Sequence, residues 1–458
     1  MKTLNQLFIA LSFVGLSFFS ASCDEENNIM CDNTENEVAN ICLGHFDISC
    51  TEFDAKETRS GTSTNWKTGD KIYLTFENNA YGMATYKTDR WTVEYFGKLT
   101  KNQKKTCKVV YFENPKSTEE FQAVNLTHET GIYEDTLAYY QYDGTVLNIT
   151  ANLFPKTGRM RFKGTYKDTV RVYGLTYGTK YSVYKGEYED TLQFVELIAK
   201  SDGYTPYIYG SFADSTARRL NVVTSKNAYS REFADSIMTK GQSGWLSIPT
   251  NDSHVAWINK LIFKVKTVEF AMVPVPKWDY LSFLIGETEV TQGLYNALTS
   301  TEFVKSNYPQ TFLSYDDSQS FISKINAGTG IVFSLPTTTQ WEFAYKGGEK
   351  SQKYTYSGSN TASEVAWYKD NSGGKAHEVA TLMPNELGIY DMSGNLGEWT
   401  CTSTLYQDNR NYSKYYTKYY LYQCNYSTSA TLSKTFNSSY SNINSFSLTG
   451  IRLTLSFK

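Results

Sequence analysis

Cysteine is the residue type of this chain best suited to redox or metal chemistry, and its 458 residues include seven cysteines. Cys23 follows an apolar N-terminal run, and six more are spread along the chain: Cys31, Cys42, Cys50, Cys107, Cys401 and Cys424. Their spacing fits no metal cluster, and the histidines are scattered singly, so we expect no zinc site at His45, His128, His254 or His377. Six cysteines permit three disulfides without establishing any of them.

The composition argues against a nucleic-acid partner and for several folded domains. The net charge is -3, from 44 basic and 47 acidic residues, without long blocks of one sign. Binding nucleic acid would need a basic face that meets the phosphates, so we expect no such partner. With 40% hydrophobic residues over this length, the chain can bury the cores of roughly two to four domains.

The first 22 residues have the pattern of a secretory signal that ends at a cysteine. A basic start at Lys2 precedes an apolar run from Leu7 to Phe19, which is too short to span roughly 30 Å of hydrocarbon as a helix. The small residues before Cys23 resemble a bacterial lipoprotein signal, which implies an acylated Cys23 and anchoring to the outer membrane, facing the cell exterior. The "DEEN" that follows resembles the export signal of surface-displayed lipoproteins of the Bacteroidota. A plain secretory signal, with Cys23 as an ordinary thiol, is the alternative.

Residues 45–267 contain many short segments rich in Val, Ile, Tyr, Phe and Thr, such as "KIYLTF" and "VRVYGLTYG", separated by Gly, Asn and Asp turns. We expect two β-sandwich domains here, at 45–150 and 151–267, behind a polar tether over residues 23–44. The stretch "TRSGTSTNWKTGDKIYLTF" (58–76) resembles the opening of fimbrillin-type proteins, the lipoprotein subunits of type V pili. That resemblance implies two successive β-sandwiches and other pilus subunits as partners.

Long motifs fill the last part of the chain: "FLIGETEVTQGLYNAL" (283–298), "FSLPTTTQWEFAYKGG" (333–348), "GIYDMSGNLGEWT" (388–400) and "GIRL" (450–453). In order and spacing they resemble the formylglycine-generating enzyme, or sulfatase-modifying factor, family. The resemblance implies a C-type-lectin-like fold over residues 268–458. The Thr run and closing Gly pair of the second motif predict a short helix. The predicted fold class is therefore multidomain, with an all-β N-terminal half followed by an α+β C-type-lectin-like domain.

The catalytic cysteines of that family are not repeated in this chain. Those enzymes oxidise a substrate cysteine with two of their own, a few residues apart near the C-terminal end, which bind copper as thiolates. The corresponding stretch here contains Cys424 alone, and Cys401 lies 23 positions earlier. Because a fold does not confer an activity, we expect no catalytic residue and no organic cofactor. A disulfide between Cys401 and Cys424 is possible, and would stabilise the fold by roughly 3 kcal/mol.

A calcium site is the family feature whose residues are kept. In the resembled enzymes a calcium ion binds the turn that corresponds to "DMSGNLGE". Residue by residue, the resemblance assigns the ion to the Asp391 side chain, the backbone oxygens of Gly394 and Leu396, and the Glu398 carboxylate. Carboxylates and carbonyls at close spacing suit a hard cation. The alternative is that Asp391 and Asn395 shape the turn while Glu398 pairs locally.

Tyr, Ser and Asn dominate residues 401–449, while the flanking "GEWT" and "GIRL" keep the family pattern. Tyrosine offers a large, stiff contact area with a polar tip, and Ser and Asn offer adaptable hydrogen bonds, as in antibody binding sites. We predict a surface for a protein or glycan ligand, formed by Tyr406, Tyr412, Tyr415, Tyr416, Tyr419, Tyr420, Tyr422, Asn425, Tyr426 and Tyr440. The composition resembles the variable proteins of diversity-generating retroelements, which diversify the end of a C-type-lectin-like domain by mutating adenines. A drifting loop in a Tyr-rich protein is the alternative.

These features together predict a surface lipoprotein in which two β-sandwiches project a non-catalytic lectin-like domain, as in an adhesin. Two alternatives remain open. One is an oxidase of the formylglycine-generating type that acts on a cysteine substrate, and the other is a structural type V pilus subunit.

Overall fold

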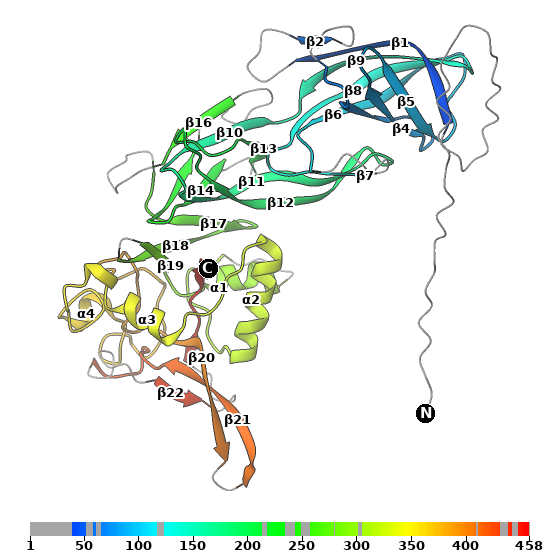
Figure 1. The fold of residues 1–458 in the computed structure, drawn as a ribbon. Coiled ribbons are helices and arrows are strands. Elements are labelled where there is room, and N and C mark those ends of the chain that lie inside the picture. Colours follow the sequence, from blue (N-terminus) through cyan, green and yellow to red (C-terminus); the bar gives the residue numbers. More distant parts are fainter. Residues whose placement is uncertain are drawn as a thin grey trace, which may run out of the picture.

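Most of the regular secondary structure in this fold is β-strand (Figure 1). The computed structural model describes residues 39–51, 58–60, 66–116, 123–212, 218–233, 243–248, 257–278, 280–300, 305–408, 411–430, 438–441 and 448–457. Two β-structures are followed by a mixed α and β domain, which confirms the predicted multidomain fold class. The predicted signal, Cys23 and most of the predicted tether lie outside the described residues. Of the helices described, none combines the length and apolar character needed to cross a membrane.

The first sheet closes on itself around one apolar core. Its strand order is β2-β1-β5-β4-β3-β6-β8-β9, and β1 also pairs in parallel with β9, which closes the ring. Ile72, Val109 and Leu147 are among its fully buried residues. Its strands are β1 (Ala39–Thr51), β2 (Thr58–Ser60), β3 (Lys71–Thr75), β4 (Tyr81–Tyr86), β5 (Trp91–Phe96), β6 (Lys104–Glu113), β8 (Gly131–Tyr142) and β9 (Val146–Pro155).

The second sheet surrounds a separate core that contains Met160, Phe162 and Val222. The change of sheet falls between Pro155, where β9 ends, and Gly158, where β10 begins. Strand β7 crosses over, since it precedes β8 in the chain yet pairs with β11. The strands are β7 (Ala123–Asn125), β10 (Gly158–Lys163), β11 (Thr169–Ser182), β12 (Glu187–Ile198), β13 (Ile208–Phe212), β14 (Arg219–Val223), β15 (Ala228–Glu232) and β16 (Ser243–Ser247).

The C-terminal domain combines two four-stranded sheets with short helices. One sheet has the order β17-β18-β19-β24 and the other β22-β21-β20-β23. The strands are β17 (Leu261–Val265), β18 (Val268–Lys277), β19 (Tyr280–Gly286), β20 (Gly397–Asp408), β21 (Asn411–Tyr422), β22 (Ser438–Ser441), β23 (Thr449–Gly450) and β24 (Thr454–Ser456). Strand β17 lies ahead of the boundary expected at residue 268 because it is the hairpin partner of β18.

The three longest helices of this domain begin at side chains that cap them. Ser314 and Thr337 each form a capping box at the start of α2 and α3. Helix α3 is the short helix that the Thr run and Gly pair predict. The helices are α1 (Gln292–Thr299), α2 (Tyr315–Thr329), α3 (Thr338–Tyr345), η1 (Gly348–Lys350) and α4 (Ala362–Val365).

The second sheet and the C-terminal domain share one apolar core. Tyr173 of β11 stacks on Phe194 with ring centroids 4.7 Å apart, and it packs edge-on against Phe263 of β17 at 5.8 Å. Arg219 of β14 forms an ion pair with Glu269 of β18 over 2.7 Å. Apolar contacts of this kind are close-packed, so they hold the C-terminal domain in a defined orientation to the second sheet.

Gly174 allows β11 to change partners within one strand. Before it, Tyr173 pairs with β14, and after it Leu175 pairs with β13. Its φ is +97°, and a Cβ at this position would collide with the carbonyl oxygen of Arg219. Both the backbone conformation and the close approach therefore require glycine here.

Gly174→Ala should destabilise the protein more than Gly69→Ala. Both glycines have φ of +97°, but a Cβ at Gly69 would meet nothing within 4 Å. We expect about 1–2 kcal/mol for Gly69→Ala, the cost of this φ for an L-residue, and at least about 2 kcal/mol more for Gly174→Ala, because the backbone must also move. Urea unfolding of both variants measures the two losses, and equal losses would contradict the steric argument.

Candidate functional site

The Tyr-rich segment forms a β-hairpin that extends from the body of the C-terminal domain (Figure 1). Strands β20 and β21 pair from Glu398 and Tyr422 at the base to Asp408 and Asn411 near the tip. At the base, β21 also pairs with β22, and β20 with β23. Beyond the base the described strands form a two-stranded ribbon, and its residues 403–405 are exposed. The outer part of the hairpin, residues 403–419, is called the arm below.

Tyr422 closes the base of the hairpin as a core residue. Its ring stacks on Trp341 with centroids 4.0 Å apart and planes 12° apart, and its side chain is 1% exposed. Its hydroxyl donates to Oε1 of Glu342 over 2.8 Å, and burial raises the pKa of Tyr422. The prediction that Tyr422 contacts a ligand is therefore wrong, because side chains of α3 cover it.

Asn425 shapes the turn that follows β21. Its side chain is 8% exposed, and its Oδ1 accepts hydrogen bonds from the backbone N–H and the hydroxyl of Ser427. An amide side chain that bonds two residues ahead imposes a local turn. The predicted ligand contact is therefore wrong for Asn425 too. Its neighbour Tyr426 is half-buried, and its backbone N–H donates to the carbonyl of Asn395.

Tyr419 and Tyr420 are half-buried where the arm meets the domain. Tyr419 stacks on Tyr315, the first residue of α2, with centroids 3.5 Å apart and planes 14° apart. Burial, with the neighbouring Tyr419, raises the pKa of Tyr315 to about 12. The remaining predicted residues have their backbone on β20, β21 and β22, but their side chains lie outside the described part, so they stay predictions: Tyr406, Tyr412, Tyr415, Tyr416 and Tyr440.

Cys401 and Cys424 are not joined in a disulfide in the structure. Cys401 is exposed on β20, whereas Cys424 is 5% exposed and burial raises its pKa to about 12. The two lie on opposite sides of the paired residues Glu398 and Tyr422 along the ladder. At about 3.3 Å per residue this offset exceeds the roughly 7 Å between Cα atoms that a disulfide can bridge. The Cys401–Cys424 disulfide is therefore absent.

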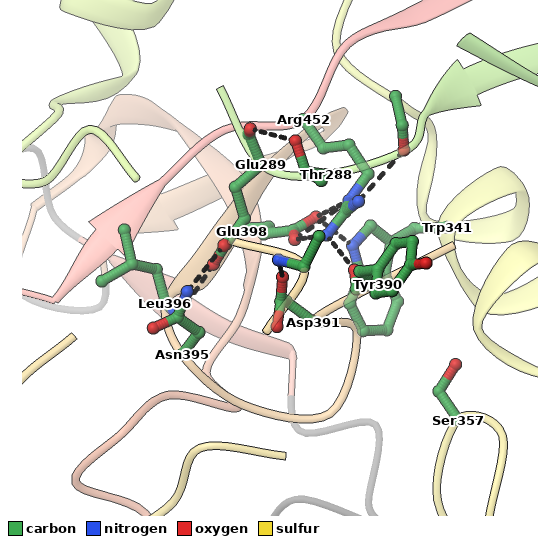
Figure 2. A network of polar contacts seen from close by, with 12 residues as sticks. Thr288, Glu289, Trp341, Ser357, Tyr390, Asp391, Asn395, Leu396, Glu398 and Arg452 are labelled. Atoms are coloured by element: carbon green, nitrogen blue, oxygen red, sulfur yellow. Dashed lines mark hydrogen bonds and ion pairs between the residues drawn. The ribbon is translucent and has the colours of Figure 1, made fainter. Parts of the chain in front are cut away.

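A buried ion pair lies behind the base of the hairpin (Figure 2). Arg452 donates from Nη2 to Oε1 of Glu398 over 2.7 Å and from Nε to both carboxylate oxygens at 3.1 Å. Trp341 donates from Nε1 to Oε2 of Glu398 over 2.6 Å. The carbonyls of Gly286 and Tyr390 accept the other hydrogen bonds of Arg452. Since these hydrogen bonds engage both carboxylate oxygens of Glu398 and all three guanidinium nitrogens of Arg452, the two charges can remain buried.

Glu289 joins this network from the segment before α1. Its Oε1 accepts from the backbone N–H of Leu396 over 3.0 Å, and its Oε2 accepts from Nδ2 of Asn395 over 2.9 Å. Sequence reasoning missed Glu289 and Arg452 as parts of a site. A signal was present for Arg452, which is the charged residue of the otherwise apolar motif "GIRL", and buried charges need partners. For Glu289 the signal was weak, because the polar motif "GETEVT" also contains Glu287 and two threonines.

Three buried carboxylates surround one buried guanidinium here. Burial raises the pKa of Glu289 well above its usual range and that of Asp391 to about 6. Asp391 has φ of +61°, and its Oδ2 accepts from the backbone N–H of Ala380 over 2.8 Å. Its buried Oδ1 has no hydrogen-bond partner among the described residues. An orphan carboxylate oxygen of this kind suits a proton or a cation.

The predicted calcium ligands fit these contacts only in part. Oδ1 of Asp391 is a buried oxygen that calcium could use, and the backbone oxygens of Gly394 and Leu396 come from the same turn. Glu398 does not fit, because Arg452 and Trp341 engage both of its oxygens. In the described part of the chain, no three His, Cys, Asp or Glu residues are arranged to hold a metal ion. Calcium binding through Asp391 stays a prediction.

Arg452→Met should destabilise the C-terminal domain by about 3–5 kcal/mol, because it leaves Glu398 buried without its partner. Adding Glu398→Gln should recover part of that loss, since glutamine carries no charge. Urea unfolding followed by tryptophan fluorescence measures both. As a control, Lys260→Met breaks a half-buried pair with Glu287 and should cost less than about 1 kcal/mol. Additive losses in the double variant would show that the pair is not coupled.

Calcium should raise the melting temperature of the protein relative to EDTA, because an ion that binds only the folded state stabilises it. Asp391→Asn should abolish this difference, since it removes the negative charge of the only predicted side-chain ligand that is not paired with an arginine. Thermal unfolding of both proteins, with calcium and with EDTA, makes the comparison. Equal melting temperatures for the wild type under the two conditions would exclude the site.

The family comparison matches the C-terminal part of the chain. Residues 250–454 match the family described as sulfatase-modifying factor enzyme 1-like domain. "Chaperone protein LppX" of Paenibacillus barcinonensis is 46% identical over 84 residues, which cover 15% of this chain and 30% of that protein. "Inactive C-alpha-formylglycine-generating enzyme 2" of Bos taurus is 28% identical over 108 residues, 21% of this chain and 34% of that protein. The chain thus spans about a third of the length of these curated relatives.

Two solved structures are similar to parts of the chain. "Treponema denticola variable protein 1" has a TM-score of 0.35 at 22% identity, over 43% of this chain and 99% of that one. The tip fimbrial protein Mfa3 from Porphyromonas gingivalis has a TM-score of 0.26 at 8% identity, over 46% of this chain and 97% of that one. Among these similarities, the family match covers the C-terminal domain most fully: residues 250–454 are similar in sequence to the sulfatase-modifying factor enzyme 1-like domain.

Proposed function

We propose that this chain is a lipid-anchored surface adhesin whose C-terminal domain binds protein or glycan ligands through the β20–β21 hairpin and performs no catalysis. The observation that carries the proposal is the contrast between a closed framework and an open arm. Trp399, Leu421 and Tyr422 are at most 3% exposed at the base, whereas residues 403–405 of the arm are exposed. Side chains at positions 403–405 can therefore change without a cost to the core.

The position of the arm in the molecule suits display. The first described strand, β1, belongs to the first sheet, and the hairpin lies at the other end of the molecule (Figure 1). With acyl chains on Cys23, the two β-structures would act as a stalk that holds the arm away from the outer membrane. The fimbrillin-like stretch at 58–76 adds other pilus subunits as candidate partners of that stalk.

The cysteine geometry supports binding over oxidation. Copper chemistry of the family type needs two thiolates close together. Here Cys401 is exposed on β20, and Cys424 is buried with a raised pKa, which disfavours its thiolate. The similar Bos taurus protein is named as an inactive formylglycine-generating enzyme. A sequence related to this chain is thus already named as lacking the activity.

Diversification of residues 401–449 by a retroelement is part of the proposal. We expect sibling isolates to carry a reverse transcriptase gene beside a near-copy of the segment encoding residues 400–453, with differences confined to adenine positions. Sequencing this locus in several isolates makes the test. Changes should concentrate in codons of the arm and spare those of buried residues such as Arg452. An invariant segment would remove the main support for a variable binding surface.

A separate assay tests the oxidase alternative. The purified protein, incubated with a sulfatase-type cysteine peptide, oxygen and copper, should yield no formylglycine. Mass spectrometry of the peptide detects the product. Turnover that Cys424→Ser abolishes would overturn the non-catalytic proposal.

A further inference from the structure

Phe312 is an exposed aromatic residue in a backbone conformation that favours glycine. Its φ is +59°, and its side chain is 68% exposed. A bulky residue at positive φ is strained, and residues of this kind gather at functional sites. Because single exposed apolar residues are common, the position of Phe312 decides what this strain means.

Hydrogen bonds hold the segment around Phe312 against the base of the hairpin. The carbonyl of Leu313 accepts from Nε1 of Trp399 over 2.8 Å and from Oγ1 of Thr449 over 2.9 Å. Trp399 lies on β20, and Thr449 lies on β23, which pairs with β20. The backbone next to Phe312 is therefore fixed against the base of the hairpin by residues of the hairpin sheet itself.

Helix α2 begins three residues after Phe312 and contacts the arm directly. Tyr315 stacks on Tyr419 and packs edge-on against Trp399 at 5.8 Å. Figure 1 shows one end of α2 beside the base of β20. On β20, Leu405 is 71% exposed. Exposed apolar side chains thus occur on both the framework and the arm, and the half-buried Tyr419 pairs with Ser403, two residues before Leu405.

We propose that Phe312 is a fixed ligand-binding residue beside the variable arm, and that the ligand is a protein that presents apolar side chains. The inference rests on the proposed function and narrows its ligand class. Phe312 lies outside residues 401–449, so diversification of that segment would leave it unchanged. Phe312 would remain the same aromatic contact while the residues of the arm vary. A few such residues contribute much of the binding free energy of protein interfaces.

The chemistry of this surface favours a protein over a glycan. Phe312 and Leu405 gain free energy by removing apolar surface from water, and neither side chain has a donor or acceptor for sugar hydroxyls. Next to Tyr315, the exposed Asp316 adds a carboxylate. We therefore expect the partner to place a Lys or Arg beside its apolar residues, because opposite charges face each other across protein interfaces.

A phage-displayed library of random peptides, selected on the immobilised full chain, tests this inference. Enriched peptides should carry aromatic or aliphatic residues together with Lys or Arg. Phe312→Gly should weaken their binding by about tenfold or more. Since glycine tolerates φ of +59°, the same variant should unfold at the same urea concentration as the wild type or at a higher one. Loss of binding without loss of stability separates a ligand contact from a structural role.

Two control variants separate a specific contact of Phe312 from general effects on binding. Phe154→Ala removes a 49% exposed phenylalanine from β9 of the first sheet and should leave peptide binding unchanged. A shortened hairpin, with residues 404–418 replaced by an Asn-Gly turn, removes the arm. Peptides that need the arm but not Phe312 would overturn this inference and leave the proposed function standing. Peptides that bind without the arm and without Phe312 would overturn both this inference and the proposal that the hairpin binds ligands. If no peptide is enriched and the protein instead binds a glycan array, the inference of a protein ligand is overturned.

Discussion

The buried ion pair between Glu398 and Arg452 is the contact on which the C-terminal domain depends. Glu398 lies three residues before position 401, and Arg452 lies three residues after position 449, so the pair joins the two ends of the Tyr-rich segment. Separating these charges would leave either one buried without a partner, which is strongly unfavourable. The chain between them can therefore differ in sequence while its two ends stay together.

Near this ion pair, tyrosine occurs both as a core residue and as a half-buried residue. Tyr422 stacks on Trp341, which also donates to Glu398, so the base of the hairpin and the ion pair form one packed unit. Tyr419, three residues earlier, stacks on Tyr315 and keeps part of its surface open. Tyrosines of one strand can thus be fully buried at the base of the hairpin and half-buried three residues away, because the ring packs well in a core and also suits a wet surface.

The apolar core that the C-terminal domain shares with the second sheet fixes the two relative to each other. Tyr173 and Phe263 pack together across the boundary, and Arg219 pairs with Glu269 beside them. An apolar contact between neighbouring domains restricts their relative motion. A ligand bound at the arm would therefore pull on a framework of defined orientation, and a strained residue such as Phe312 can keep its position there.

Local sequence signals were sufficient to predict the fold class and one helix. Alternating apolar residues predicted the β-rich first half, a Thr cap and a Gly pair predicted α3, and the long motifs predicted the family of the last domain. Contacts between distant residues were not accessible in this way. Tyr419, Tyr420 and Tyr422 are close together on β21, yet Tyr422 is a core residue and the other two are half-buried, a difference that composition alone does not predict.

The ion pair and the thiols illustrate the same limit. Glu398 and Arg452 are 54 residues apart, and Glu289 reaches Leu396 across 107. The separation of Cys401 from Cys424 follows from the register of β20 and β21, which no spacing in the chain encodes. Residue types and short motifs carry the fold class, whereas strand register and packing settle which charges pair, which thiols stay apart and that Tyr422 belongs to the core.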